Sequence, residues 1–129
     1  MTKKELSRYF YLSLEIADLE ERKKQLESTS IGSAKLTGMP TVHSNTSPTE
    51  RIVELIDELQ RRIDKRKVEA MKEMMKIEKF LSEIQEIETR LIFTKRYIEL
   101  KTWEQIGDDM HMSSRTAQRM HKNYLDSLN

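Results

Sequence analysis

The chain has 129 residues, a length that suits one domain or one domain with an extension. Charged residues make up 35% of it, above the usual ~25%, while hydrophobic residues reach 36% and the net charge is +1. This composition excludes a membrane span and a large globular core, and the lack of cysteine excludes disulfides and thiolate metal sites. We therefore expect an all-α protein built from long helices with narrow apolar seams.

Residues 1–27 predict an N-terminal helix, over roughly residues 3–27. Thr2 and Glu5 have the spacing of a capping box. Apolar residues follow at helical spacing: Leu6, Tyr9, Phe10, Leu12, Ile16, Leu19 and Leu26. The charged start lacks the apolar stretch of a signal peptide, so we expect a cytoplasmic protein. Residues 28–47 hold two of the three glycines and Pro40, with Pro48 directly after them, and predict a flexible linker.

A long helix is predicted after this linker, over residues 48–86 and continuing to about residue 100. Ser47, Pro48 and Glu50 form a start signal, and neither glycine nor proline follows until Gly107. A seven-residue apolar repeat runs through the segment: Ile56, Ile63, Ala70, Ile77, Ile84, Leu91 and Ile98. The companion positions are apolar at both ends and charged in the middle: Ile52, Leu59, Arg66, Glu73, Phe80, Ile87 and Thr94. This pattern is typical of a coiled coil. A hairpin broken near residues 66–67 is the alternative.

Such a seam must be covered by the N-terminal helix, by a second copy of the chain, or by both, and we favour a homodimer. The residues expected at the dimer interface are Ile56, Leu59, Ile63, Ile77, Ile84 and Leu91. Met71, Met74 and Met75 could fill the polar centre of the seam. The basic run of residues 61–67 could also contact phosphate, but we favour a solvated face or a partner for the acidic N-terminal helix.

Residues 87–129 predict a helix-turn-helix. Thr102 and Ser113 are suitable N-caps for two helices, and only His111 and Met112 separate them. Gly107 provides the small residue needed where the helices cross, and His111 stands where the turn requires a positive φ. The inner faces are expected to contain Trp103, Ile106, Met110, Ala117, Met120 and Leu125. A stripe of Phe93, Tyr97 and Leu100 is expected to pack on Trp103 and Ile106.

The second helix of such a motif lies in the major groove of double-stranded DNA. Arg115, Gln118 and Arg119 are the candidates for contact with base edges, because Arg pairs with guanine and Gln with adenine. Ser113, Ser114 and Lys122 are better placed for phosphates. Residues 86–129 contain seven basic and seven acidic side chains. One copy alone should therefore bind DNA weakly, since affinity depends mostly on phosphate neutralisation.

The stretches 91–98, 102–106 and 113–116 resemble region four of bacterial sigma factors, in which an Arg-Tyr or Arg-Phe helix end precedes a Thr-Trp-Glu-Glu-Ile helix and a Ser-Arg recognition helix. The order of N-terminal helix, linker, long charged helix and sigma-like end is similar to phage transcriptional regulators of the ArpU/RinA type. That resemblance implies control of late phage genes in a bacterial host, through promoter DNA and possible contact with RNA polymerase. His111 and Ala117 depart from the pattern, which has glycine and a branched apolar residue there.

Two other functions compete with transcriptional regulation. One is a phage DNA-packaging protein of the small-terminase kind, and the other is an adaptor that binds RNA polymerase rather than DNA. We expect no enzyme activity, no cofactor and no metal, because the three histidines (His43, His111 and His121) lack metal-ligand spacing and no catalytic constellation is present.

Overall fold

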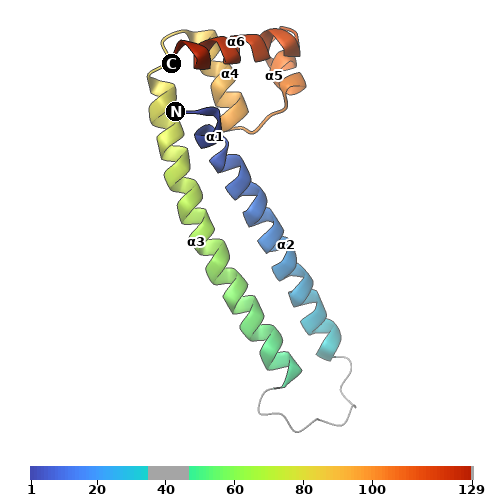
Figure 1. The fold of residues 1–129 in the computed structure, drawn as a ribbon. Coiled ribbons are helices and arrows are strands. Elements are labelled where there is room, and N and C mark those ends of the chain that lie inside the picture. The colour runs from blue at the N-terminus through green and yellow to red at the C-terminus, as the bar shows by residue number, and fades with distance from the viewer. Residues whose placement is uncertain (35–46, 129) are drawn as a thin grey trace. The chain divides into compact units, whose positions relative to one another are not determined.

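A computed structural model describes residues 1–34 and 47–128, and every regular element in these two stretches is a helix. The helices are α1 (Lys3–Leu6), α2 (Arg8–Ala34), α3 (Pro48–Ser82), α4 (Ile87–Tyr97), α5 (Trp103–Met110) and α6 (Ser114–Ser127), as Figure 1 shows. The predicted all-α fold class is confirmed. None of the helices described is both long enough and apolar enough to cross a bilayer.

The predicted N-terminal helix exists, with one irregular residue. The Thr2 hydroxyl accepts from the Glu5 amide, and the Glu5 carboxylate accepts from the Thr2 amide, so the capping box is confirmed. Ser7 separates α1 from α2, where its hydroxyl donates to the Lys3 carbonyl at 2.8 Å. A serine that bonds the carbonyl four residues before it is a common cause of a bend in a helix.

The predicted linker, residues 28–47, starts too early, because helix α2 continues to Ala34. A single glycine inside a helix costs only ~1 kcal/mol relative to alanine, so Gly32 does not end it. Residues 35–46 of the predicted linker lie outside the described part of the chain. Helix α3 then begins as predicted, with Ser47 and Glu50 exchanging side-chain and backbone hydrogen bonds around Pro48.

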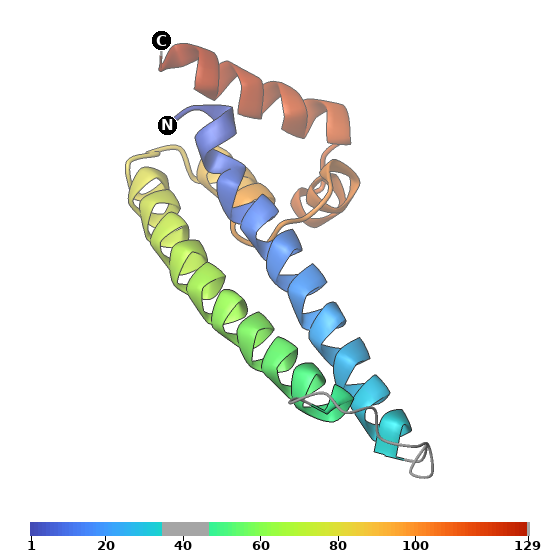
Figure 2. The same ribbon diagram turned by 60° about the horizontal axis from the view of Figure 1, so that its bottom comes forward.

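The chain divides into two compact units, and residues 13–34 and 47–69 form one of them. In Figures 1 and 2 this part of α2 runs beside the first part of α3. Leu19 packs against Leu59 and Ile63, with Ile16 and Leu26 at the edge of the cluster. The polar part of the seam is matched by acidic residues of α2, where Glu15 pairs with Arg66 and Glu20 pairs with Lys67.

The other unit comprises residues 1–12 and 70–128, and the buried residues of its largest core cluster come from α1, from α3 and the turn after it, and from α4. The buried members are Leu6, Ile77, Phe80, Leu81, Ile84, Phe93 and Tyr97. Glu73, the second charged companion of the seam, is buried and lies 3.7 Å from the Arg8 guanidinium and 3.5 Å from the Lys76 ammonium. A buried carboxylate is tolerated when it is paired in this way.

Within one chain, these contacts already cover most of the residues on which the prediction of a dimer rests. Leu59 and Ile63 are covered by α2 of the same chain, and Ile77 and Ile84 belong to the core that includes Leu6. Their apolar surface is already removed from water, so it cannot drive association of two copies. Ile56 is half-buried, and only Leu91 is exposed, at 42%.

The predicted continuous helix to about residue 100 is wrong, and so is the alternative hairpin near residues 66–67. Helix α3 ends at Ser82, where the amides of Glu83 and Ile84 donate to the carbonyls of Phe80 and Leu81 in a tight final turn. The Ser82 hydroxyl also donates to the Lys79 carbonyl at 2.6 Å. The chain then reverses without glycine or proline and starts α4 at Ile87.

This break changes which face of α4 is buried. The heptad pattern predicts that Leu91 and Ile98 continue the seam, but the buried residues of α4 are Thr89, Ile92, Phe93 and Tyr97. The turn over residues 83–86 shifts the helical phase, so the repeat read before it does not apply after it. Met71 and Met75 are likewise exposed, at 65% and 70%, and do not fill the centre of the seam, whereas Met74 is half-buried.

Candidate nucleic-acid interface

Helix α5 is fixed at its start by the residues that the sequence indicates. The Thr102 hydroxyl accepts from the Gln105 amide at 3.2 Å, and the Gln105 side chain accepts from the Thr102 amide at 2.9 Å. This reciprocal pair satisfies amides that have no partner inside the helix. Ile106 is fully buried against Ile92 of α4 and Ala117 of α6, and Trp103 and Met110 cover the edge of this cluster.

The turn after α5 has the geometry that the sequence predicts. His111 is the C-cap of α5, with φ 56° and ψ 43°, in the left-handed region. The Met112 amide donates to the Gly107 carbonyl at 2.9 Å. A Cβ on Gly107 would lie 2.7 Å from the Met112 carbonyl oxygen and 3.0 Å from the Ser114 amide nitrogen. Glycine is therefore required by the close crossing of α5 and α6, as predicted.

Helix α6 starts at the predicted cap, where the Ser113 hydroxyl accepts from the Thr116 amide at 3.1 Å. Its inner face buries Ala117 and His121, while Met120 and Leu125 are half-buried. Its outer face consists of exposed polar side chains. The residues predicted to contact DNA are found there: Ser113, Arg115, Gln118, Arg119 and Lys122 are exposed, and Ser114 is half-buried.

The basic side chains of this outer face have no acidic partner within the described residues. Neither Arg115, Arg119 nor Lys122 forms an ion pair there, although the same chain pairs Arg66, Lys67, Lys95 and Lys101 with carboxylates. Their positive charge is therefore not neutralised inside the protein. The helix presents three cations and one amide to solvent in two adjacent turns.

The sequence predicts no role for His121, which is only excluded as a metal ligand there. It is 5% exposed and lies within an aromatic cluster, with its ring 4.8 Å from Phe93, 5.6 Å from Tyr97 and 5.0 Å from Trp103. Its Nε2 atom lies 2.5 Å from the Tyr97 hydroxyl. Its spacing could have indicated that it is buried, because His121 follows Ala117 by one helical turn on the buried side of α6.

Both partners of this hydrogen bond are neutral at physiological pH. Burial, reinforced by the nearby positive charges of Lys3 and Arg96, lowers the pKa of His121 from 6.5 to about 4. Burial also raises the pKa of Tyr97 from 10.0 to about 12, against a smaller opposite effect of Arg96. In a buried site the charged forms lose their hydration, so the neutral forms are favoured. The pair joins α4 to α6 and fixes the inner face of α6.

Phe93 and Tyr97 are buried as expected, but they belong to a different core cluster from the predicted partners Trp103 and Ile106. They pack in the cluster with Leu6 and Phe80, and their rings face His121 and Tyr124. Ile92, which belongs to neither of the predicted apolar stripes, packs against Ile106. Leu100 is half-buried and lies beyond the end of α4, in the loop before α5, where its φ is 58°, so it does not extend the apolar stripe of α4.

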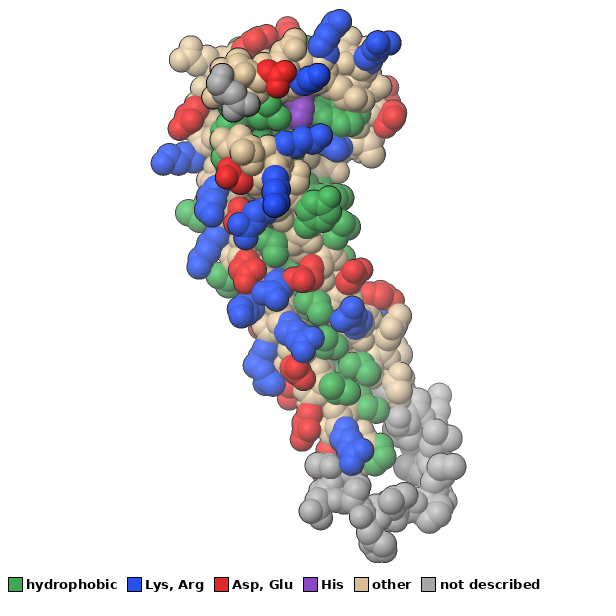
Figure 3. Space-filling view, in the orientation of Figure 1, with side chains coloured by type: hydrophobic (Ala, Val, Ile, Leu, Met, Phe, Trp, Pro, Cys, Tyr) green, Lys and Arg blue, Asp and Glu red, His purple; other side chains and the backbone are tan. Residues whose placement is uncertain are grey.

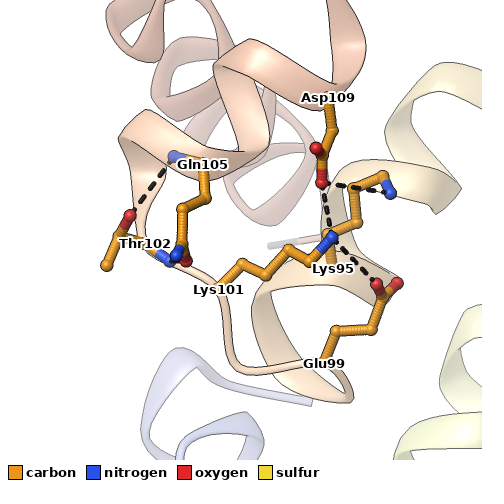
Figure 4. Close-up of polar contacts among 6 residues, drawn as sticks. All are labelled: Lys95, Glu99, Lys101, Thr102, Gln105 and Asp109. Atoms are coloured by element: carbon orange, nitrogen blue, oxygen red, sulfur yellow. Dashed lines mark hydrogen bonds and ion pairs between the residues drawn. The ribbon is translucent and has the colours of Figure 1, made fainter.

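Polar contacts attach α5 to the end of α4, as Figure 4 shows. The Lys101 ammonium donates to the Asp109 carboxylate at 2.5 Å and lies 3.3 Å from Glu99, while Lys95 lies 3.5 Å from Asp109. The hydrogen bond from Lys101, with smaller effects of Lys95, lowers the pKa of Asp109, and the same bond raises the pKa of Lys101. These contacts hold the helix that precedes the turn.

Arg96 completes the attachment on the other side of this junction. Its guanidinium carbon lies 4.7 Å from the centre of the Trp103 ring and its Nη1 donates to the Lys101 carbonyl at 3.0 Å. A guanidinium over an indole ring is a favourable cation–π contact. These contacts hold α5 against the end of α4, and the buried face of α6 packs on both helices.

The fold and this site define an all-α protein with one short helix whose exposed face is basic and whose opposite face is buried. The model of a family described as protein of unknown function (DUF1492) matches residues 45–129. The chain belongs to this family, and the match includes all residues of the exposed face of α6. No curated protein and no solved structure is significantly similar to the chain.

Proposed function

We propose that the protein is a sequence-specific DNA-binding transcriptional regulator in which α5 and α6 act as a helix-turn-helix. The observation that carries this proposal is the outer face of α6, where Arg115, Gln118, Arg119 and Lys122 are exposed and the three cations have no acidic partner among the described residues. In helix-turn-helix proteins the second helix enters the major groove and its first residues approach base edges. The short turn and the close crossing at Gly107 support that assignment.

Each residue of the face receives a role from its chemistry. Arg115 and Arg119 can each donate two hydrogen bonds to a guanine, and Gln118 can pair with an adenine. Lys122 and the hydroxyl groups of Ser113 and Ser114 bind phosphates and fix the position of α6 along the groove. The Ser113 hydroxyl also caps α6, so the same side chain would stabilise the helix and bind a phosphate.

The biological setting rests on the resemblance to sigma region four and to ArpU/RinA-type regulators. We infer a role at promoters of phage late genes in the cytoplasm of a bacterial host, with RNA polymerase as a possible second partner. The family match gives no function of its own, because the family is described only as one of unknown function. The target sequence must therefore be found by experiment.

The experiment is a selection of genomic DNA fragments by the purified protein at moderate salt, followed by sequencing. The wild type is compared with the double variant Arg115→Ala/Arg119→Ala. A matched control, Arg61→Ala/Lys65→Ala, removes the same charge from exposed positions on α3. We expect enrichment of fragments upstream of a gene with the wild type and with the control, and its loss with the first variant. Equal enrichment by all three proteins would show that α6 does not read the sequence.

The selection also distinguishes the packaging and adaptor functions. A packaging protein would enrich a single site near its own structural genes, rather than sites upstream of transcription units. An adaptor would enrich nothing, and both double variants would still bind RNA polymerase. Absence of enrichment by the wild type at moderate salt would therefore refute direct promoter recognition.

A further inference from the structure

An open hollow lies beside the outer face of α6, and the start of the chain forms its other side. Its volume is about 740 Å³, and it is lined by side chains from α1, α5 and α6. The basic members are Lys3, Arg115, Arg119 and Lys122. On the face drawn in Figure 3, Lys and Arg side chains (blue) lie at and below the position that α6 has in Figure 1, among apolar side chains (green) and some acids (red). The hollow thus combines residues that are far apart in the sequence.

The hollow is electropositive, because four cations line it and Asp126 is the one acid that does. Lys3, like the three cations of α6, has no ion pair within the described residues. His121 also lines the hollow, and the charge of Lys3 contributes to the lowered pKa of this imidazole. Cations gathered without a counter-charge repel one another, and an anion placed among them relieves this repulsion.

The position of the hollow along α6 indicates which anion fits. It extends past Lys122 to Leu125 and Leu128, so it follows α6 to its C-terminal end. Helix α6 has 14 residues and a length of about 21 Å, whereas the major groove is ~12 Å wide. When the first turns of α6 face the bases, its last turns must therefore lie at the wall of the groove, where the phosphates are.

We propose that the part of this hollow lined by Lys3 and Lys122 receives the sugar–phosphate backbone of one DNA strand beside the groove that α6 enters, with these two lysines as phosphate-binding residues, while Arg115, Gln118 and Arg119 face the bases. This inference rests on the proposed function and adds a second DNA-contacting element, α1, which the sequence does not indicate. Residues 86–129 contain equal numbers of basic and acidic side chains, so this segment alone has little net positive charge with which to bind DNA. Lys3 supplies positive charge from outside that segment, close to Lys122.

The test measures how DNA affinity depends on salt concentration, by fluorescence anisotropy with a labelled random-sequence duplex and with a selected genomic fragment. We expect Lys3→Ala to weaken binding to both duplexes alike and to reduce the slope of log K against log salt by about 0.9, the value for one lost phosphate contact. Lys4→Ala is the matched control, because Lys4 is exposed, carries the same charge and does not line the hollow. It should leave the slope unchanged.

A gain-of-binding variant guards against loss through unfolding. Asp126→Asn removes the acid of the hollow and should strengthen binding at low salt by about two- to fivefold, because a repulsion with phosphate is lost. Thermal melting followed by circular dichroism checks that each variant is folded. If Lys3→Ala and Lys4→Ala give the same slope as the wild type while Arg115→Ala/Arg119→Ala loses selectivity, the role of α1 is refuted and the proposed function stands. If the wild type binds neither duplex, both fail.

Discussion

Lowering the pH should destabilise the unit that contains His121, and the size of the effect follows from its burial. The pKa of this imidazole is about 4 in the folded protein and 6.5 in its ordinary state. The unfolded chain therefore binds more protons between these values, so its free energy falls relative to the folded state as the pH decreases. The contribution of His121 is fully present above pH 6.5 and is lost as the pH falls toward 4.

The magnitude can be worked out for one practical interval. Between pH 7 and pH 5 the lowered pKa of His121 should cost about 2 kcal/mol of the free energy of unfolding. Carboxylates elsewhere also titrate in this range, so a variant that lacks the imidazole is needed. His121→Phe alone would leave the Tyr97 hydroxyl without its partner. The comparison is therefore between Tyr97→Phe, which retains the imidazole, and Tyr97→Phe/His121→Phe, which does not.

The assay is urea unfolding followed by the fluorescence of Trp103, the single tryptophan, whose ring lies 5.0 Å from that of His121. The two variants should differ by about 2 kcal/mol in how much stability they lose between pH 7 and pH 5. An equal loss in both variants would refute the argument that a neutral, buried His121 supports this unit.

Three other changes probe the packing around the site. Gly107→Ala should lower the free energy of unfolding in urea by about 1–2 kcal/mol and weaken DNA binding. The new Cβ would clash with backbone atoms, and the cost of this clash should exceed the ~1 kcal/mol gained in helix propensity. Unchanged stability would contradict the close crossing. Ile77→Ala should lower the free energy of unfolding by about 2–5 kcal/mol, and the exposed control Met75→Ala by less than ~0.5 kcal/mol. The unfolding midpoints should not change with protein concentration. A concentration-dependent midpoint would support a dimer through the seam. Lys101→Met should raise the pKa of Asp109, measured by carbon NMR of the carboxyl group, and no change would show that the hydrogen bond is absent in solution.

Local signals in the sequence predicted the local structure well. The caps at Thr2, Ser47, Thr102 and Ser113 depend on residues within three positions of each other, so their hydrogen bonds could be expected from spacing alone. The left-handed His111 could be expected for the same reason, because only two residues separate the helices.

The break between α3 and α4 could not be predicted in this way. No glycine or proline marks residues 83–86, and the heptad pattern continues through them without interruption. The chain turns there because Ile84 and Phe93 are both buried in one core, and that arrangement depends on Leu6, 78 positions before Ile84 in the sequence. A repeat reports which residues are apolar, but not which part of the chain covers them.

The candidate site also contains residues that local spacing predicts and residues that it does not. The exposed positions on α6 follow from helical periodicity, so Arg115, Gln118, Arg119 and Lys122 were identified from the sequence. The hollow was not predicted, because only the packing of α1 in the folded unit brings Lys3 to it. The burial of His121 was not predicted for a related reason, since its aromatic neighbours come from α4 and α5.

The burial of Leu6 has a practical consequence for anyone who expresses this protein in parts. The family match begins at residue 45, so a shortened chain designed from it would lack α1 and α2. Ile77, Ile84 and Phe93 would then lose the leucine that packs against them and would meet water. Such a fragment would contain every side chain proposed for base recognition and still be prone to aggregation, because the folding unit begins before the matched segment does.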